Sequence, residues 1–182
     1  YTNLNGLYAS YNGTQADRSV IAGNRVFDNS TGIQGNYVTE VRDNEVWGNT
    51  SYGVSLYYGA QAHDNAVWGN ATGLLGYSGN RLYDNRVWAN TTGIELQYGN
   101  EAYGNRVYGN SGVGIGVNQW DNWVHNNVVQ ANGGAGVLLN GAYWSSTGTR
   151  IENNTIVGTL ADALVVQSNS SNIRIRNNIL EQ

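Results

Sequence analysis

The feature that most constrains this chain is a short string of residues that recurs along most of its length. The string reads Asn-x-Val-aromatic-x-Asn, and complete copies begin at Asn24, Asn44, Asn65, Asn85 and Asn105. Shortened copies begin at Asn127, Asn154 and Asn178, so the spacings are 20, 21, 20, 20, 22, 27 and 24 residues. Repeats of this length are typical of solenoids, in which each repeat packs only on its neighbours.

Aligning the copies on the leading Asn shows which positions face the interior. The second residue after it is always aliphatic: Val26, Val46, Val67, Val87, Val107, Val129, Ile156 and Leu180. The fifth residue after it is Asn in six copies: Asn29, Asn49, Asn70, Asn90, Asn110 and Asn132. Short apolar patches that alternate with polar positions indicate strands rather than helices. Asn and Gly between the patches accept the left-handed backbone of tight corners.

These patterns predict an all-β fold, a right-handed single-stranded parallel β-helix (a solenoid) with about eight coils of 20–27 residues. Stacked coils place parallel strands about 4.8 Å apart, and parallel crossovers are right-handed as a rule. Each buried Asn can then bond to the next coil, which avoids the ~1–3 kcal/mol cost of an unpaired buried amide. We expect one domain over residues 1–182, with an incomplete first coil at 1–19 and an enlarged corner loop at 140–150.

Composition narrows the classes of partner. The formal charge is −4 and the basic residues form no cluster, which argues against nucleic acid and anionic membrane surfaces. No apolar run reaches the ~18 residues that membrane insertion needs. The chain has no Cys, which excludes disulfides, thiol nucleophiles and Cys-ligated metals.

The repeat, with its closing stretch from Asn153 to Leu180, resembles the parallel β-helix repeat family over roughly residues 20–182. Members of that family include polysaccharide lyases, alginate epimerases, a periplasmic copper-accessory protein and very large multi-repeat bacterial surface proteins. The resemblance implies the β-helix fold. Function has to be argued from the outer positions, because the matching columns are interior or corner positions.

An aromatic strip is the first candidate site. One residue beyond the aliphatic column stand Phe27, Trp47, Trp68, Trp88 and Tyr108. In an alternating strand this position faces solvent, and a row of rings can bind the apolar faces of sugars. Alternatively, the rings only stabilise the sheet by stacking. An exposed row this long is unusual in a lone soluble monomer.

Catalytic chemistry is the second candidate. The column two residues before the leading Asn includes Arg42, His63, Tyr83 and Tyr103. In polyuronate lyases and epimerases an Arg neutralises the uronate carboxylate, while a His or Tyr moves the proton at carbon 5. The Tyr-Gly-Phe-Asp-Pro-His stretch of alginate epimerases is absent, and the chain contains no Pro. The alternative is a mixed polar outer face without catalysis.

Three acids precede the leading Asn on successive coils: Asp43, Asp64 and Asp84. Carboxylates at this spacing could form a glycosidase pair or bind calcium. Every residue of the column belongs to the small set that accepts a left-handed corner, so turn geometry explains the column without catalysis or calcium. We therefore expect no cofactor, with calcium as the alternative. A zinc site is not expected because the two His residues lie on different coils.

The longer spacings place extra aromatic residues at two neighbouring corners. These residues are Trp120, Trp123, Tyr143 and Trp144, with Asp121 and His125 nearby. Loops on a rigid scaffold often carry binding sites, so a shallow pocket for carbohydrate is one interpretation. An aromatic plug over a less regular coil is the other.

Neither end of the sequence shows an amphipathic capping helix. Uncapped coils expose strand edges, so we expect either continuation in a longer repeat chain or head-to-tail self-association. The favoured function is a non-catalytic, rigid or self-associating module of a secreted or cell-surface protein, in contact with polysaccharide through the aromatic strip. The alternatives are a polysaccharide lyase, epimerase or glycosidase, and a carbohydrate-binding module.

Overall fold

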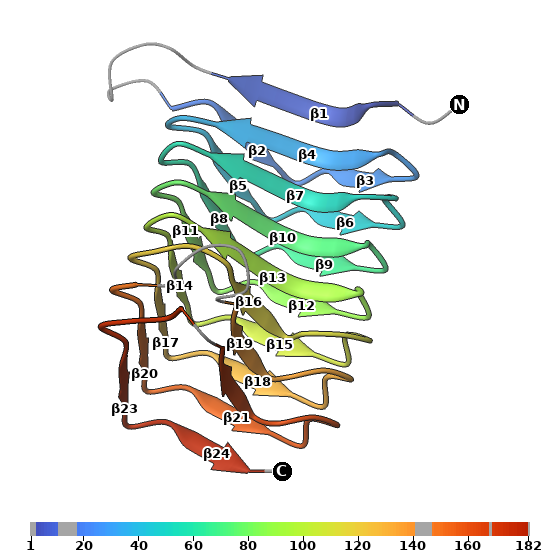
Figure 1. Ribbon diagram of the computed structural model, residues 1–182. Helices are drawn as coiled ribbons and strands as arrows, with labels where there is room; N and C mark the ends of the chain where they lie inside the picture. The colour runs from blue at the N-terminus through green and yellow to red at the C-terminus, as the bar shows by residue number, and fades with distance from the viewer. Residues whose placement is uncertain (1–2, 11–17, 141–146, 168, 182) are drawn as a thin grey trace.

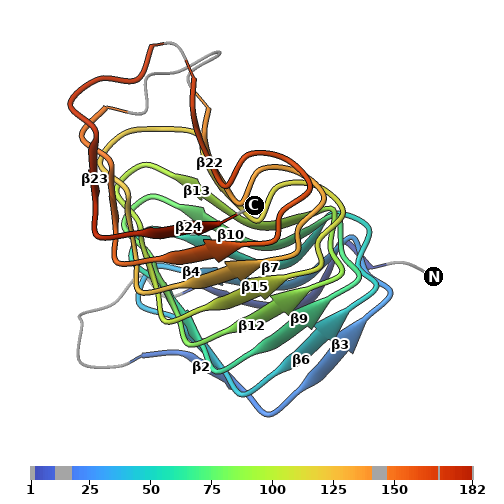
Figure 2. The ribbon, with the colours of Figure 1, turned by 90° about the horizontal axis from the view of Figure 1, so that it is seen from below.

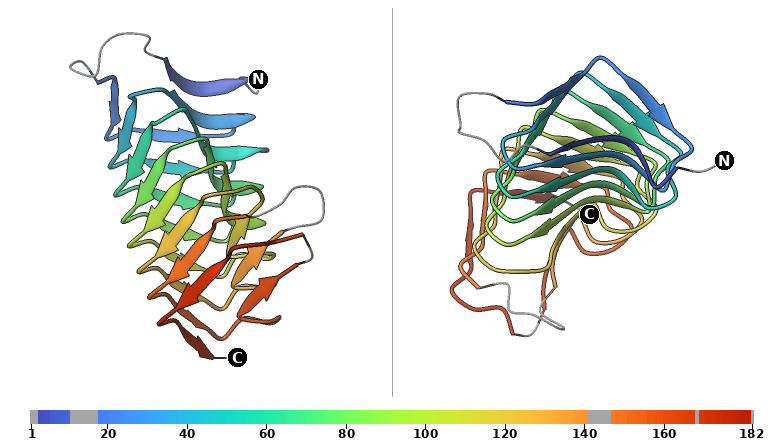
Figure 3. Two further views of the ribbon diagram at one scale, coloured as in Figure 1. Left: turned by 60° about the vertical axis from the view of Figure 1, so that its left-hand side comes forward. Right: turned by 90° about the horizontal axis from the view of Figure 1, so that it is seen from above.

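A computed structural model describes residues 3–10, 18–140, 147–167 and 169–181. Every regular element in these residues is a β-strand, and the strands wind into coils stacked along one axis (Figure 1). Seen along the stack, neighbouring coils follow one another with a gradual offset, and the last coils extend outward near β22 (Leu164–Val166) and β23 (Arg174–Arg176) (Figures 2 and 3). In this part of the chain no helix is long and apolar enough to cross a membrane.

Each coil contributes one strand to each of three parallel, eight-stranded sheets. Sheet A contains β1 (Asn5–Ser10), β4 (Thr31–Asn36), β7 (Tyr52–Tyr57), β10 (Thr72–Tyr77), β13 (Thr92–Gln97), β16 (Ile115–Val117), β19 (Val137–Leu139) and β22 (Leu164–Val166). Sheet B contains β2 (Val20–Ala22), β5 (Glu40–Arg42), β8 (Gln61–His63), β11 (Arg81–Tyr83), β14 (Glu101–Tyr103), β17 (Trp123–His125), β20 (Arg150–Glu152) and β23 (Arg174–Arg176). Sheet C contains β3 (Arg25–Phe27), β6 (Glu45–Trp47), β9 (Ala66–Trp68), β12 (Arg86–Trp88), β15 (Arg106–Tyr108), β18 (Val128–Gln130), β21 (Thr155–Val157) and β24 (Ile179–Glu181). The predicted parallel β-helix is therefore confirmed.

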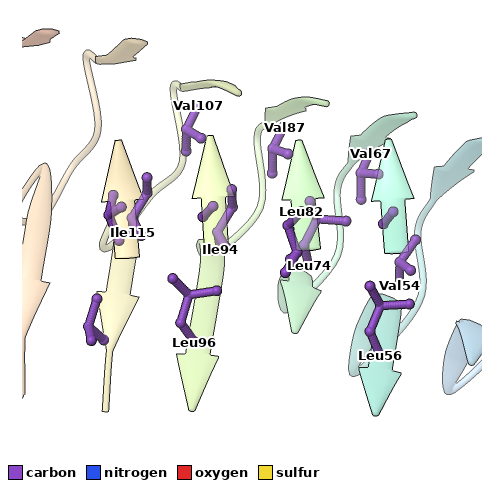
Figure 4. Packing of buried hydrophobic residues seen from close by; sticks show 14 of the residues in the cluster. Val54, Leu56, Val67, Leu74, Leu82, Val87, Ile94, Leu96, Val107 and Ile115 are labelled. Carbon is purple, nitrogen blue, oxygen red and sulfur yellow. The ribbon is translucent and has the colours of Figure 1, made fainter. Parts of the chain in front are cut away.

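The core is a continuous apolar column inside the coils. Val67, Leu74 and Leu82 come from sheets C, A and B and are fully buried (Figure 4). Parallel pairing repeats this contact in the next coil, because Val67 lies beside Val87 and Leu74 beside Ile94. The aliphatic columns of the sequence are thus interior columns of the fold.

The two predicted Asn columns form ladders at the corners between sheets B and C and between sheets C and A. Asn85 is buried, and its Nδ2 atom donates to Asn105 Oδ1 at 3.0 Å, to Ala62 O at 2.9 Å and to Tyr83 O at 2.9 Å. The corresponding contact in the second ladder joins Asn70 Nδ2 to Asn90 Oδ1 at 3.0 Å. Each ladder satisfies buried backbone and side-chain groups together.

A third Asn ladder, which the sequence analysis missed, lies at the corner from sheet A to sheet B (the A–B corner). Asn80 Nδ2 donates to Asn100 Oδ1 at 2.9 Å, and Asn100 Nδ2 donates to Asn122 Oδ1 at 3.1 Å. Preceding coils carry Ala60 and Thr39 at this buried position. In the sequence this ladder corresponds to the position five residues before the leading Asn. The position is Asn in only three coils, so its repeat is weak.

The corner from sheet B to sheet C has the predicted left-handed geometry. Asp43, Asp64 and Asp84 have φ values of 55°, 53° and 53°, and Asn126 and Asn153 have 54° and 56°. Turn geometry therefore explains this column. The corner loop predicted at 140–150 falls partly on 141–146, outside the described residues, and β20 begins at Arg150.

Candidate functional site

The outer face of sheet B brings the four predicted catalytic residues into one line. Parallel pairing sets Arg42 beside His63, His63 beside Tyr83, and Tyr83 beside Tyr103. His125 on β17 continues the line beside Tyr103. We call these five residues the sheet B column. Residues about 20 apart in the chain thus become nearest neighbours because the coils stack in register.

The rings of the sheet B column stack face to face. His63 and Tyr83 have ring centroids 4.6 Å apart at an interplanar angle of 10°. Tyr83 and Tyr103 are 5.0 Å apart at 3°, and Tyr103 and His125 are 5.2 Å apart at 11°. Because each ring covers its neighbour, the faces of these rings are largely occupied within the protein.

His63 is held between two carboxylates. Its Nε2 atom lies 3.2 Å from Glu40 Oε1, and its Nδ1 atom lies 2.8 Å from Asp64 Oδ2. Glu40 Oε1 also accepts from Arg42 Nε at 3.0 Å. Both ring nitrogens of His63 are therefore in contact with carboxylate oxygens of the protein itself.

His125 has a different second partner. Its Nε2 atom lies 3.1 Å from Glu101 Oε1, and Asn126 Nδ2 lies 2.9 Å from its Nδ1 atom. Glu101 also pairs with Arg81, with Oε2 and Nε 3.3 Å apart. The stacked imidazole is thus bordered by a carboxylate, Asp64, at His63 and by an amide, Asn126, at His125.

The tyrosines of the sheet B column are poor bases. Burial is the main cause that raises the pKa of Tyr83, followed by the neighbouring Tyr103. Burial also raises the pKa of Tyr103, followed by the charge of Glu101. A general base works best with a pKa near the operating pH, and these shifts move both phenols further from it.

The aromatic strip on sheet C is also a stack. Centroid distances run from 4.6 Å for Phe27 and Trp47 to 5.9 Å for Trp88 and Tyr108, with interplanar angles between 6° and 14°. Arg86 lies over the Trp88 ring at 4.7 Å. The inner rings therefore cover one another and present edges to solvent, while Phe27 at the end of the strip is 48% exposed.

The aspartates considered for calcium contact other side chains. Asp43 Oδ2 lies 2.6 Å from an Arg42 guanidinium nitrogen, and Asp64 Oδ2 contacts His63. In the described ranges no group of three or more His, Asp or Glu side chains could hold a metal ion. Calcium binding thus gains no support from this column and stays a prediction.

The residues predicted at the enlarged corners separate into two surfaces. Trp123 stacks on His125 at 4.0 Å, with Arg150 over its ring at 4.1 Å, so it extends the sheet B face. Trp120 instead meets Tyr98 at the A–B corner, with centroids 4.6 Å apart at 75°. Tyr143 and Trp144 lie outside the described residues.

A cluster that the sequence analysis did not recognise runs along the A–B corner. We call it the aromatic ridge, and its members are Tyr37, Tyr57, Tyr58, Tyr77, Tyr98 and Trp120. Its signal was an aromatic residue at the end of the sheet A strand, or within three residues after it, on five successive coils. The signal was missed because the alignment was anchored on the Asn columns at the other two corners.

The fold and these ladders define the protein as a parallel β-helix whose outer faces carry aromatic and ion-paired side chains. The chain belongs to the family described as periplasmic copper-binding protein (NosD), which matches residues 2–111 and again 77–182. Copper does not fit the residues present, because the chain has no Cys or Met and its two His lie on β8 and β17.

Solved structures show the same fold. The periplasmic alginate epimerase AlgG is similar with a TM-score of 0.75 and 21% identity, over 90% of this chain and 45% of AlgG. The A-module of the mannuronan C-5 epimerase AlgE4 from Azotobacter vinelandii is similar with a TM-score of 0.64 and 14% identity, over 88% of this chain and 57% of that module. The chain thus spans about half the length of these structures. A comparison with curated proteins found no match.

Proposed function

We propose that this chain is a non-catalytic β-helix module that acts outside the cytoplasm and binds polysaccharide through its outer aromatic surface. The observation that carries the non-catalytic part is the double contact of His63 with Glu40 and Asp64, since it occupies both ring nitrogens of the best candidate base. The polysaccharide part is supported by the aromatic residues on all three outer faces. The word periplasmic, which describes both the family and AlgG, supports the location.

The test is a binding and turnover screen with the chain as it exists. We expect retention on at least one polysaccharide in affinity electrophoresis, without any change in that polymer. Unsaturated products are followed by absorbance and inversion at carbon 5 by proton NMR. Absence of binding to neutral and anionic polymers alike would overturn the proposal.

A second candidate function is a polyuronate lyase or epimerase on sheet B. It is favoured by one observation, the alignment of Arg42, His63, Tyr83 and Tyr103 on consecutive strands. In that case polymannuronate or polygalacturonate is converted, and the Tyr83→Phe and His63→Ala variants lose the activity. Equal activity in both variants would exclude this site.

Self-association along the axis is a third proposal, and the polarity of the ladders favours it. Each Asn donates to the Oδ1 atom of the Asn in the following coil, as Asn24 does to Asn44 and Asn154 to Asn178. The first coil of a stack therefore exposes the Oδ1 acceptors of its ladder Asn residues, and the last coil exposes the N–H donors of its own. β24, which contains Leu180, is an edge strand of sheet C. Light scattering with a Leu180→Asp variant tests whether particles longer than one chain form through this edge.

A further inference from the structure

We propose that the aromatic ridge at the A–B corner is the polysaccharide site, and that its ligand is an uncharged glycan that lies along the axis of the coils. This inference rests on the proposed function. It assigns the binding to a surface other than the stacked strip of sheet C or the ion-paired column of sheet B.

Ring orientation separates the ridge from the other two aromatic rows. From Tyr58 onward the ridge is edge-to-face: Tyr58 and Tyr77 meet at 84°, Tyr77 and Tyr98 at 72°, and Tyr98 and Trp120 at 75°. Only the first pair, Tyr37 and Tyr58, is stacked, with an interplanar angle of 27°. Edge-to-face contacts leave part of the ring faces uncovered, whereas stacked rings cover them. Tyr37, Tyr58 and Trp120 are 41%, 52% and 44% exposed. The ridge therefore offers the free ring faces on which a sugar can stack.

Backbone conformation is the second, independent observation. Tyr37, Tyr58 and Tyr98 have φ values of 58°, 58° and 55°. A bulky residue in the left-handed region is an outlier, and such strain concentrates at functional sites. At the corner from sheet B to sheet C, the residues with left-handed backbone are Gly, Asp and Asn, which accept this conformation more easily. A Tyr at the A–B corner therefore has a less favourable backbone conformation than Gly, Asp or Asn would have. A binding role of the aromatic ring explains why Tyr stands there.

Length and spacing suit a linear polymer. The ridge places at least one aromatic residue on each of five successive coils, from Tyr37 to Trp120. Coils repeat every ~4.8 Å, so the ridge is about 19 Å long. Hexose units in an extended glycan advance by a similar step. Consecutive sugars can therefore meet consecutive coils.

Charge favours an uncharged ligand. The strands of sheets B and C carry Arg side chains, but none of the strands of sheet A does. Glu95 on β13 lies on this side and accepts from Gln97 at 3.0 Å and from Asn118 at 2.8 Å. A depression of about 170 Å³ on sheet A is lined in part by Glu95, Gly116 and Asn118. Amide groups there can bond sugar hydroxyls, while the carboxylate repels a polyuronate.

The experiment measures the affinity of the 182-residue chain for soluble β-glucan and β-mannan and, in parallel, for oligogalacturonate. The variants are Tyr58→Asn, Trp120→Asn and the pair combined. Loss of one ring is expected to weaken neutral-glycan binding roughly fivefold, and loss of both more than tenfold. Tyr58→Asn should keep or raise the melting temperature, because Asn accepts the left-handed backbone. A fall in binding without a fall in stability therefore separates ligand contact from misfolding.

Tyr8→Ala is the matched control, because Tyr8 is an exposed ring on β1 that belongs to none of the three aromatic rows. It should leave the affinity unchanged. Phe27→Ala tests the sheet C strip as the alternative binding surface. The inference is wrong if Phe27→Ala removes binding while Tyr58→Asn does not, or if the chain binds only oligogalacturonate and loses it in Arg42→Ala. Both of those results would keep the proposed function, whereas no binding to any polymer overturns it as well. A change of oligomeric state in Tyr58→Asn with unchanged glycan affinity would instead mark the ridge as a protein interface.

Discussion

The Nε2 atom of His63 on β8 lies 3.2 Å from the Oε1 atom of Glu40 on β5, one coil earlier. The same Glu40 oxygen accepts from Arg42 Nε, so one half-buried carboxylate joins two members of the sheet B column. We expect Glu40→Gln to lower the free energy of unfolding by about 1 kcal/mol, because the charge-assisted bonds to both partners weaken. Urea unfolding measures the change.

Glu45→Gln is the control for that variant. Glu45 pairs with Arg25 at 3.1 Å, but both side chains are more than half exposed. An exposed pair of this kind contributes little, so its loss should change stability by less than ~0.5 kcal/mol. Equal losses in the two variants would contradict a special role for Glu40.

The Asn ladders should respond strongly to loss of a single amide. Asn85→Ala leaves the backbone and side-chain N–H groups of Asn65 without their acceptor, Asn85 Oδ1. We expect the free energy of unfolding to fall by about 2–4 kcal/mol, since buried groups lose their partners. Asn36→Ala is the control, because that side chain contacts Tyr8 and Gln34 on the outer face. Hydrogen exchange of the amides in neighbouring coils would show whether the damage stays local, as expected of a repeat array.

One glycine on sheet A is required by a close approach between coils. A Cβ atom on Gly73 would lie 2.6 Å from Gly93 O and 2.6 Å from Val87 Cγ1. We expect Gly73→Ala to cost about 1–3 kcal/mol through backbone shifts. Gly116→Ala is the control on the same sheet, where the nearest atom to the new Cβ is Ile94 O at 3.9 Å. Thermal unfolding of the two variants compares the effects, and a Gly73→Ala chain as stable as the wild type would show that the coils can separate freely.

Stability should fall in alkaline solution. The pKa of Tyr83 and of Tyr103 is raised above the ordinary value of 10.0, mainly by burial. The folded chain therefore binds these protons more tightly than the unfolded chain does. The stabilisation is complete below pH 10 and is lost as the pH rises through the folded-state values.

The Tyr83→Phe and Tyr103→Phe double variant should lose less stability above pH 10 than the wild type loses. Denaturant melts at neutral and alkaline pH measure this difference. Tyr8→Phe, on the exposed face of β1, is the control and should follow the wild type. A double variant with the same alkaline slope as the wild type would rule out the burial of these phenols as the cause.

Some outer positions were predictable and others were not. The outward direction of Trp47, His63 and Tyr83 follows from strand alternation, and the structure agrees. The degree of ring overlap did not follow, because it depends on side-chain rotation against the next coil. The aromatic ridge escaped notice because its Tyr and Trp residues occupy different positions from coil to coil, some at the end of the strand and some in the turn after it. The sugar-binding role of the strip and the catalytic role of the sheet B column stay predictions.

The sequence by itself determined the coil, the apolar interior and two of the three Asn ladders. It did so because burial and left-handed corners restrict residue type locally, and the restriction repeats about every 20 residues. Only the tertiary structure decided that Glu40 bonds His63, that the strip of sheet C covers its own ring faces, and that the A–B corner leaves its rings open. Those relationships join residues of different coils through register and side-chain rotation, which no single repeat encodes.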